Sequence, residues 1–516
     1  MTKNQSFTPI IYSLLIITGI IIGSILKKPD EQNELNDKIQ LILNLVKTHH
    51  VDSLAKNFDQ TAINSILSKL DPHSSYIPAK KLKTIEEDMK GSFSGIGIQF
   101  NIINDSIVVI AAISGGPSKK LGILSGDRIV NVDDENVTNI NIQNEDVIKR
   151  LRGEKGSEVK IKIYRRSNNK LMDFNIIRDD IPLHSLDISM MLNNNIGYIK
   201  INRFSATTYN EFNSSIPNLL DQGMSKLILD LRGNPGGFLG MAIGICDELL
   251  KKENLIVYTE GRNRKRENIY ATNNGRLQNI EVIILIDEGS ASASEIIAGA
   301  IQDNDRGIVI GRRSFGKGLV QEQISLNDGS AIRLTTQRYY TPSGRCIQKP
   351  YSENNTFNLL NSLKIKPNIS NIDSTQYRTK NGRIMYAGGG IKPDIEIKRP
   401  ENRDYSSINI MLSKGWINEF CLDYALLIKK SAPLLKISDT SLDEDNIYNA
   451  FLIFLSNKKK ENFEIGKEEM KYLKNLLKAT IARNIFDDKI YYKILSEEDE
   501  FIKEAILTFK NTNLKL

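Results

Sequence analysis

The chain has 516 residues, of which 40% are apolar, and it carries a formal net charge of +7. This length is enough for about three or four domains. Because the charge is small for the length and the acidic and basic residues are interleaved, nucleic-acid binding is disfavoured. The three cysteines, Cys246, Cys346 and Cys421, lie far apart and give neither a zinc-binding spacing nor a disulfide framework.

The N-terminal segment 7–26 holds no charge and is long enough to span a bilayer as a helix. Lys3 precedes it, Lys27 and Lys28 follow it, and no small-residue cleavage site is present. We therefore expect residues 1–28 to form an uncleaved signal-anchor rather than a cleaved signal peptide.

Apolar residues recur at helical spacing from 33 to 70, so we predict an N-terminal helical region over 29–90. The segment "LDPHSSYIP" (70–78) ends this pattern, because prolines and turn formers punctuate it. His73 lies far in sequence from the serine-rich motif described below, so a structural role is predicted for it. None of the four histidines lies near that motif, which argues against a Ser-His-Asp triad.

Residues 91–178 are predicted to form a small β-rich domain. The glycine-containing loop of "GSFSGIGIQF" leads into a strand, and further strands are predicted over 106–113, 158–165 and 171–177. A helix is predicted over 141–153, where apolar residues share one face. The glycines of the first loop could serve only to shape a hairpin, an alternative that the residues alone leave open.

Residues 179–397 alternate strand and helix patterns, which favours an α/β domain. The segment "KLILDLRGNPGG" (226–237) is a strand followed by a tight loop that opens onto a helix. Backbone N–H groups of Gly236 and Gly237 are therefore expected at a helix start. A phosphate-binding loop is the rival interpretation, but the spacing G-x-x-x-x-G-K-[ST] is missing.

The segment "VIILIDEGSASASEIIAGAIQDN" (282–304) predicts a buried strand, a turn with three serines, and a helix. A serine at such a turn can attack a carbonyl while a nearby N–H group holds the oxyanion. Alternatively, Ser292 and Glu295 form a capping box. Downstream, Lys317 lies between two glycines, and burial beside the serine helix would lower its pKa and make it a general base.

Together, "LDPHSSY", "LDLRGNPGG" and "SASASEIIAGAIQDN…GRRSFGKGLVQ" resemble the C-terminal processing peptidases, or tail-specific proteases. The resemblance implies that Ser292 is the nucleophile, Lys317 the base and Gln321 the residue that orients the lysine. Ser290 and Ser294 bracket the reactive position and are rejected as nucleophiles. By the same resemblance the oxyanion donors are the N–H groups of Gly237, with Gly236 as alternate, and of Ala293.

The run "GPSKKLGILSGDRIVNVD" makes residues 91–178 similar to a PDZ domain. In such domains a peptide adds as an extra strand, and loop N–H groups capture its terminal carboxylate. This resemblance places substrate binding at Ser94, Gly95, Ile96 and Gly97. We expect residues 398–516 to be a helical extension whose default role is packing or partner contact.

The resemblance implies a multidomain α/β protein, in which a serine/lysine peptidase core carries an inserted PDZ-like domain. It implies a serine-type endopeptidase that recognises C-terminal tails of protein substrates and forms an acyl-enzyme, with no metal or organic cofactor. A homodimer or an adaptor partner is a possibility, and the active domains are expected in the periplasm, anchored to the inner membrane or free. Two alternatives remain, a serine hydrolase of small acyl esters and an inactive or gated tail-binding adaptor.

Overall fold

The structure is a computed structural model that describes residues 12–13, 17–18, 31–166, 168–272, 274–351, 375–399, 405–431, 442–459, 463 and 465–511. The chain divides into two compact units, residues 1–66 and residues 67–516. The first unit contains helix α2 (Glu31–His49) and most of α3 (Phe58–Leu67). The predicted membrane segment over 7–26 lies outside the described residues except at 12–13 and 17–18. Among the residues described, no helix is both long and apolar enough to cross a membrane.

A six-stranded sheet forms the centre of the second unit, in the order β10-β11-β12-β15-β16-β21. Only β10 (Leu186–Met191) is antiparallel to its neighbour, and the other pairs are parallel. The other strands of this sheet are β11 (Ile196–Ile201), β12 (Lys226–Asp230), β15 (Glu281–Ile286), β16 (Ile308–Gly311) and β21 (Ile395–Glu396). A parallel sheet needs cover on both faces, which explains the unbroken apolar run of β15.

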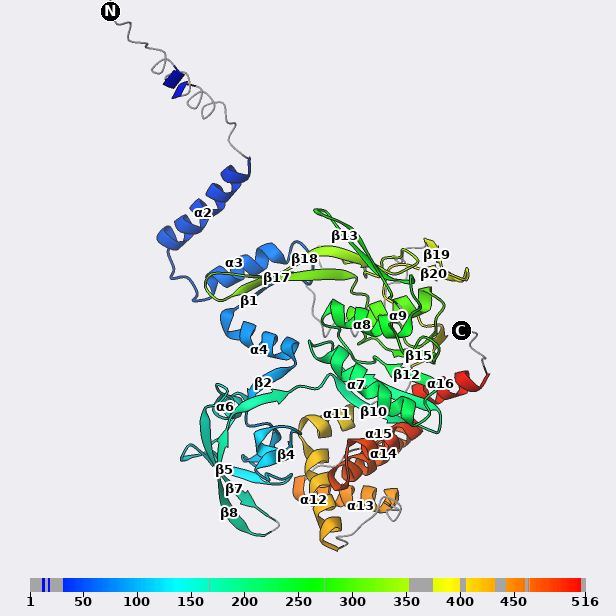
Figure 1. The fold of residues 1–516 in the computed structure, drawn as a ribbon. Coiled ribbons are helices and arrows are strands. Elements are labelled where there is room, and N and C mark those ends of the chain that lie inside the picture. The colour runs from blue at the N-terminus through cyan, green and yellow to red at the C-terminus, as the bar shows by residue number, and fades with distance from the viewer. Residues whose placement is uncertain are drawn as a thin grey trace, which may run out of the picture. The chain divides into compact units, whose positions relative to one another are not determined.

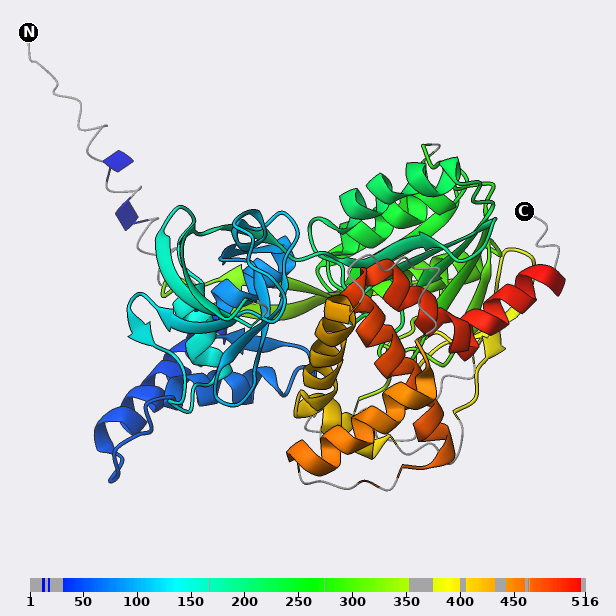
Figure 2. The same cartoon turned by 90° about the horizontal axis from the view of Figure 1, so that it is seen from below.

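Helices α7 (Thr208–Asp221), α8 (Leu239–Leu249) and α9 (Ala293–Asp303) cover one face of this sheet. Cys246 of α8 is fully buried there. The other face packs on α16 (Glu500–Asn511), whose Phe501, Ile502 and Phe509 contact the central strands. Figure 2 shows the red helix α16 on the side of the sheet opposite the green helices. The helical extension therefore completes the core around the six-stranded sheet.

A second sheet is antiparallel and has the order β1-β18-β13-β14, with β17 paired to β18 (Figure 1). Its strands are β1 (Ser75–Ile77), β13 (Leu255–Gly261), β14 (Arg264–Tyr270), β17 (Leu319–Ser325) and β18 (Ala331–Tyr340). Strand β1 belongs to the "LDPHSSYIP" segment and is followed by α4 (Ala79–Lys90). Because Ser75 pairs with Arg333 of β18, this segment is held against the strands that follow Lys317.

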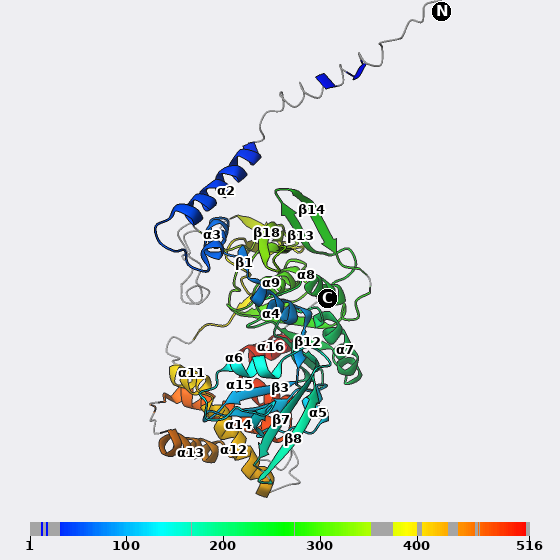
Figure 3. The same ribbon diagram turned by 90° about the vertical axis from the view of Figure 1, so that its left-hand side faces the viewer.

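The β-rich domain predicted over 91–178 has its own core and a sheet of order β3-β4-β5-β7-β8 (Figure 3). Its strands are β2 (Ser92–Gly95), β3 (Ile98–Ile102), β4 (Ile107–Ala112), β5 (Arg128–Val132), β6 (Glu135–Asn136), β7 (Glu158–Arg165) and β8 (Lys170–Ile177). Helix α5 spans Pro117–Lys120, and α6 spans Asn144–Leu151, shorter than the predicted helix. Strand β2 pairs with β9 (Asp179–Pro182). Strand β3 is an edge strand.

The remaining elements close the chain. A small hairpin is formed by β19 (Gln376–Arg378) and β20 (Ile384–Tyr386). The extension contains α11 (Ser406–Ser413), α12 (Trp416–Ser431), α13 (Glu444–Phe454), a π-helical turn (Leu455–Lys459), α14 (Lys467–Ile485) and α15 (Asp488–Glu498). Helices α11 to α14 share one apolar core. The predicted fold class, with helices at both ends, is confirmed.

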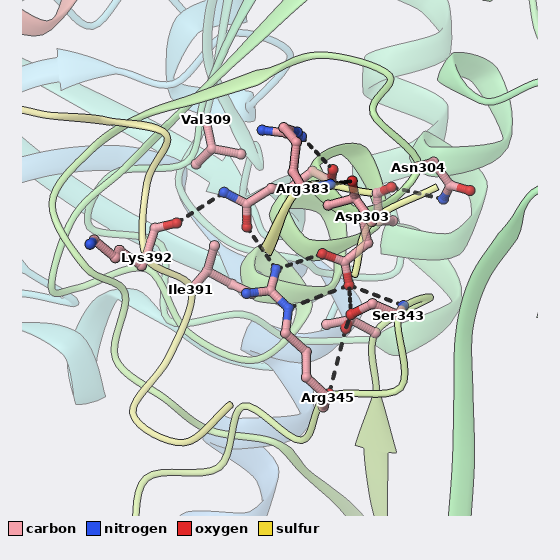
Figure 4. Close-up of polar contacts among 12 residues, drawn as sticks. Asp303, Asn304, Val309, Ser343, Arg345, Arg383, Ile391 and Lys392 are labelled. Atoms are coloured by element: carbon pink, nitrogen blue, oxygen red, sulfur yellow. Dashed lines mark hydrogen bonds and ion pairs between the residues drawn. The ribbon is translucent and has the colours of Figure 1, made fainter. Parts of the chain in front are cut away.

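A buried ion pair anchors the end of α9 to the "TPSGR" turn (Figure 4). Arg345 Nη2 donates to Asp303 Oδ1 at 2.7 Å and to Gln302 Oε1 at 2.7 Å. Ser343 Oγ donates to Asp303 Oδ2 at 2.6 Å. The side chains of Arg345 and Asp303 are only 1% and 0% exposed. The turn therefore has a structural use.

We predict that Asp303→Asn lowers the free energy of unfolding by about 3–5 kcal/mol, because removal of one partner leaves a buried charge unpaired. Urea denaturation of the full chain measures this. Asp445→Asn is the control, because Asp445 pairs with Lys474 at a side chain that is 78% exposed, and such pairs contribute about 0–1 kcal/mol. Equal effects of the two substitutions would contradict the prediction.

Candidate active site

Ser292 lies at the turn between β15 and α9, where the sequence predicts a strand-to-helix junction. It is the N-cap residue of α9, with φ 54° and ψ −110°. A positive φ is uncommon for a residue other than glycine, and such backbone strain gathers at functional sites. Its N–H group donates to Glu295 Oε2 at 2.8 Å, so the glutamate half of the predicted capping box forms. Ser292, which is half-buried, therefore lies at a sharp turn and also begins the helix.

The neighbouring serines use their hydroxyl groups to hold other loops. Ser290 Oγ donates to the carbonyl of Leu231 at 2.8 Å, and Ser294 Oγ donates to the carbonyl of Asn234 at 3.0 Å. Both side chains belong to residues that are fully buried. Their hydrogen bonds connect the serine turn with the loop after β12.

A single buried carboxylate joins the backbone of Ser292 to that of Lys317. Glu295 Oε2 accepts the N–H groups of both residues, at 2.8 and 2.9 Å. Oε1 accepts the N–H of Gly316 at 2.7 Å and the hydroxyl of Ser314. Burial raises the pKa of Glu295, and the four donors oppose that shift. Because these donors come from two segments, the carboxylate fixes the serine turn relative to the lysine loop.

The Lys317 side chain is held by a short chain of hydrogen bonds. Nζ donates to Gln321 Oε1 at 2.7 Å, and Gln321 Nε2 donates to the carbonyl of His73 at 2.7 Å. The His73 carbonyl thereby fixes which end of the Gln321 amide faces the lysine. Burial, followed by the nearby charge of Arg333, lowers the pKa of Lys317. Among the described residues, no hydrogen bond joins Nζ to Ser292 Oγ.

His73 lies beside Lys317, although the sequence assigned it a structural role because of its distance from the serine motif. Burial and the charge of Lys317 lower the pKa of His73 to about 4, so its imidazole is neutral at physiological pH. Asp71 shapes the loop by accepting the N–H groups of His73 and Ser74, each at 2.8 Å, and the hydroxyl of Thr335 at 3.1 Å. The only sequence signal that His73 lies near Lys317 is the "LDPHSSY" motif itself.

The loop after β12 lies against the serine turn. Its Gly236 and Gly237 have φ of 96° and 149°, and a Cβ on Gly237 would lie 2.0 Å from the carbonyl oxygen of Phe204. A Cβ on Gly236 would lie 2.8 Å from the Ser292 Cβ. The N–H of Gly236 already donates to Asn234 Oδ1 at 2.9 Å. In contrast, the N–H groups of Gly237 and Ala293 donate no hydrogen bond to any residue that the structure describes.

The four residues predicted to bind substrate lie in the β-rich domain, next to its edge strand β3. Ser94 and Gly95 end β2, Ile96 is 2% exposed, and Gly97 has φ 75°. The carbonyl of Ile96 accepts Ser118 Oγ at 2.6 Å, and that of Gly97 accepts the N–H of Ile113 at 2.9 Å. These bonds fix the loop at the start of the edge strand.

Comparison with known proteins identifies the family. Residues 195–370 match the model of peptidase family S41, and residues 94–177 match that of the PDZ domain. A carboxy-terminal-processing protease of Bartonella bacilliformis is 38% identical over 56% of this chain and 67% of its own length. A probable CtpA-like serine protease of Staphylococcus epidermidis is 30% identical over 79% of this chain and 76% of its own.

The chain belongs to the carboxy-terminal processing proteases of family S41. It is therefore a serine-type peptidase that carries a PDZ domain. Among solved structures, a photosystem II D1 C-terminal processing protease matches 70% of this chain and 86% of its own, at 24% identity and a TM-score of 0.39.

We predict that Glu295→Gln slows the labelling of Ser292 by a fluorophosphonate, because the serine turn and the lysine loop lose their common acceptor. It also lowers the free energy of unfolding by about 2 kcal/mol or more, since an amide leaves buried donors unsatisfied. Glu248→Gln is a matched control. Glu248 is another buried glutamate and lies in α8. Its carboxylate accepts hydrogen bonds from Tyr209 Oη at 3.0 Å and from the N–H of Arg276 at 3.0 Å. Equal slowing of labelling in both variants would contradict a local role of Glu295.

Proposed function

We propose that the chain is an endopeptidase that recognises C-terminal tails of proteins through its PDZ domain and cleaves them with Ser292 and Lys317. The observation that carries the proposal is the bridge made by Glu295, which holds the backbone of both residues in one buried cluster. The lowered pKa of Lys317 supports it further, because a neutral amine can accept a proton.

In the first step, neutral Lys317 accepts the hydroxyl proton of Ser292 while Oγ bonds to the substrate carbonyl carbon. Nζ uses an N–H to bond Gln321, so its lone pair stays available for this proton. The N–H groups of Gly237 and Ala293 stabilise the oxyanion, a contribution of about 10²–10³ in rate for one donor. The N–H groups of Gly237 and Ala293 donate to no described residue, which supports this assignment. The N–H of Gly236, in contrast, already donates to Asn234 Oδ1.

The tetrahedral intermediate then collapses. The C–N bond breaks, the leaving amine takes the proton from Lys317, and Ser292 is left as an ester of the N-terminal fragment. Water attacks this ester and gives its proton to Lys317. The second collapse returns the proton from Lys317 to Ser292 Oγ and releases a carboxylic acid, which loses its own proton to water, so the cycle balances.

Tail recognition is proposed at the edge strand β3 and the loop Ser94–Gly97. An unpaired edge can accept a peptide as an additional strand, and the loop at the strand's start can bind the terminal carboxylate. The internal hydrogen bonds of Ile96 and Gly97 support a loop of fixed shape. Periplasmic location, anchored through residues 7–26 or free, is part of the proposal; the apolar segment 7–26 supports the anchor, and the resemblance to the family supports export.

The test is cleavage of an unfolded model protein with an apolar C-terminal tail by the full chain in detergent. We expect cleavage by the wild type and none by Ser292→Ala or Lys317→Ala, and we expect slow cleavage when the tail is charged. Both variants should still bind a tail peptide. Cleavage by Lys317→Ala at the wild-type rate would overturn the serine/lysine mechanism. Tail binding without any cleavage would favour an adaptor, whereas ester turnover without cleavage of protein would favour an esterase.

We predict that kcat/KM rises with pH, with a midpoint below 10.5, the usual pKa of lysine. The sign follows because the neutral amine is the active form, and burial and Arg333 both favour that form. His73, with a pKa of about 4, does not titrate in this range. Arg333→Gln should move the midpoint to higher pH, because it removes a positive neighbour of Lys317. A midpoint that stays in place in this variant would contradict the assignment.

A further inference from the structure

Asp499, the residue just before α16, contacts the loop that carries Gly237. Arg232, in that loop, donates through Nη1 to Asp499 Oδ1 at 3.1 Å, and its Nη2 lies 2.8 Å from Asp499 Oδ2. The same guanidinium donates to Asp230 at the end of β12, through Nη2 at 2.6 Å and Nε at 2.9 Å. Arg232 thus joins the central sheet to the helical extension.

This network is well shielded from solvent. Asp230 is fully buried and also accepts the hydroxyl of Tyr198 at 2.7 Å, while the side chains of Arg232 and Asp499 are 16% and 23% exposed. The carbonyl of Arg232 accepts Lys200 Nζ at 3.3 Å. Charge-assisted hydrogen bonds in such surroundings are strong and directional. They fix the backbone at the start of the loop as well as the side chain.

Phe501 extends the contact to the segment that leads to Lys317. Two guanidinium groups contact its ring, with the carbon of Arg232 at 4.6 Å and that of Arg312 at 4.8 Å from the ring centroid. Arg312 follows β16 and pairs with Glu288 of the serine turn at 3.0 Å. Phe501 itself is 5% exposed. One helix end therefore contacts the beginnings of both loops that carry the catalytic groups.

We infer that α16 is a positioning element of the active site, in which Asp499, acting through Arg232, sets the loop that presents the Gly237 N–H. The catalytic part of this inference rests on the function proposed above. The alternative is that α16 only covers the apolar face of the sheet, with Asp499 serving as its N-cap. Asp499 does cap the helix, since its Oδ1 accepts the N–H groups of Phe501 and Ile502 at 2.9 and 3.2 Å.

Asp499→Asn separates the two roles, because asparagine is a good N-cap but carries no charge for Arg232. In the full chain, with the unfolded model protein as substrate, we expect kcat to fall about tenfold or more at unchanged KM. The fall should stay below the ~10²–10³ that follows loss of an oxyanion donor. The unfolding midpoint should remain near that of the wild type.

Glu498→Gln is the matched control, because Glu498 is adjacent and exposed and pairs only with the surface residues Lys471 and Lys503 among the described residues. It should keep the wild-type kcat. Asp499→Glu should recover part of the lost rate. Adding Asp499→Asn to Arg232→Gln should cause no further fall in kcat, because both substitutions break the same link.

Hydrogen exchange gives a readout that does not depend on catalysis. Asp499→Asn should speed amide exchange in residues 231–237 and leave the other strands and helices unchanged. Unaltered exchange in this loop overturns the inference whether or not the chain cleaves protein. A fall in kcat that comes with faster exchange throughout the sheet and a lower unfolding midpoint also overturns it, because α16 would then act as cover alone. A wild type that cleaves nothing would defeat the proposed function, and the exchange result would still decide the positioning role.

Discussion

The buried carboxylate of Glu295 is the constraint on which the arrangement of the site depends. A carboxylate removed from water must be surrounded by donors, and here two of its donors are the backbone N–H groups of Ser292 and Lys317. The side chain therefore cannot be accommodated unless the serine turn and the lysine loop lie together. These hydrogen bonds hold the backbone of Ser292 in its strained conformation, with a positive φ.

Around this centre, each segment of the proposed site is fixed by hydrogen bonds to a different part of the chain. The loop with Gly237 is held by Asn234 and by the two serines that flank Ser292, and the Lys317 side chain is held through Gln321 by the "LDPHSSY" loop. These contacts join residues that are far apart in sequence. They leave two backbone N–H groups without an internal acceptor in the described part of the chain, which is what an oxyanion site requires.

The elements of the catalytic sheet could be predicted well from the sequence, because a parallel sheet covered on both faces has unbroken apolar strands and its helices follow at regular spacing. The strand, serine turn and helix over 282–304 fall where the pattern places them. The choice of Ser292 among three serines could not come from the pattern, since the hydroxyls of Ser290 and Ser294 are distinguished only by acceptors on another loop. The resemblance to a family supplied that choice.

Two features of the site were beyond sequence reasoning for a physical reason. His73 meets Lys317 through pairing of β1 with β18, and long-range strand pairing leaves no local trace in either segment. The apolar face of helix α16 could pack against the protein's own sheet or against a partner. The sequence pattern alone does not predict which of these surfaces it contacts. Only the contacts of Asp499 and Phe501 with Arg232, and of Phe501 with Arg312, show that the helix covers the protein's own sheet.

The position of α16 along the chain has a consequence for biosynthesis. Ile228, Ile283, Leu285 and Ile310 of the sheet pack on this helix, and it is made after every other element of the site. A chain still attached to the ribosome therefore presents one apolar face of the sheet to its surroundings until residues 500–511 have emerged. During this time the nascent protein is exposed to aggregation and available to chaperones.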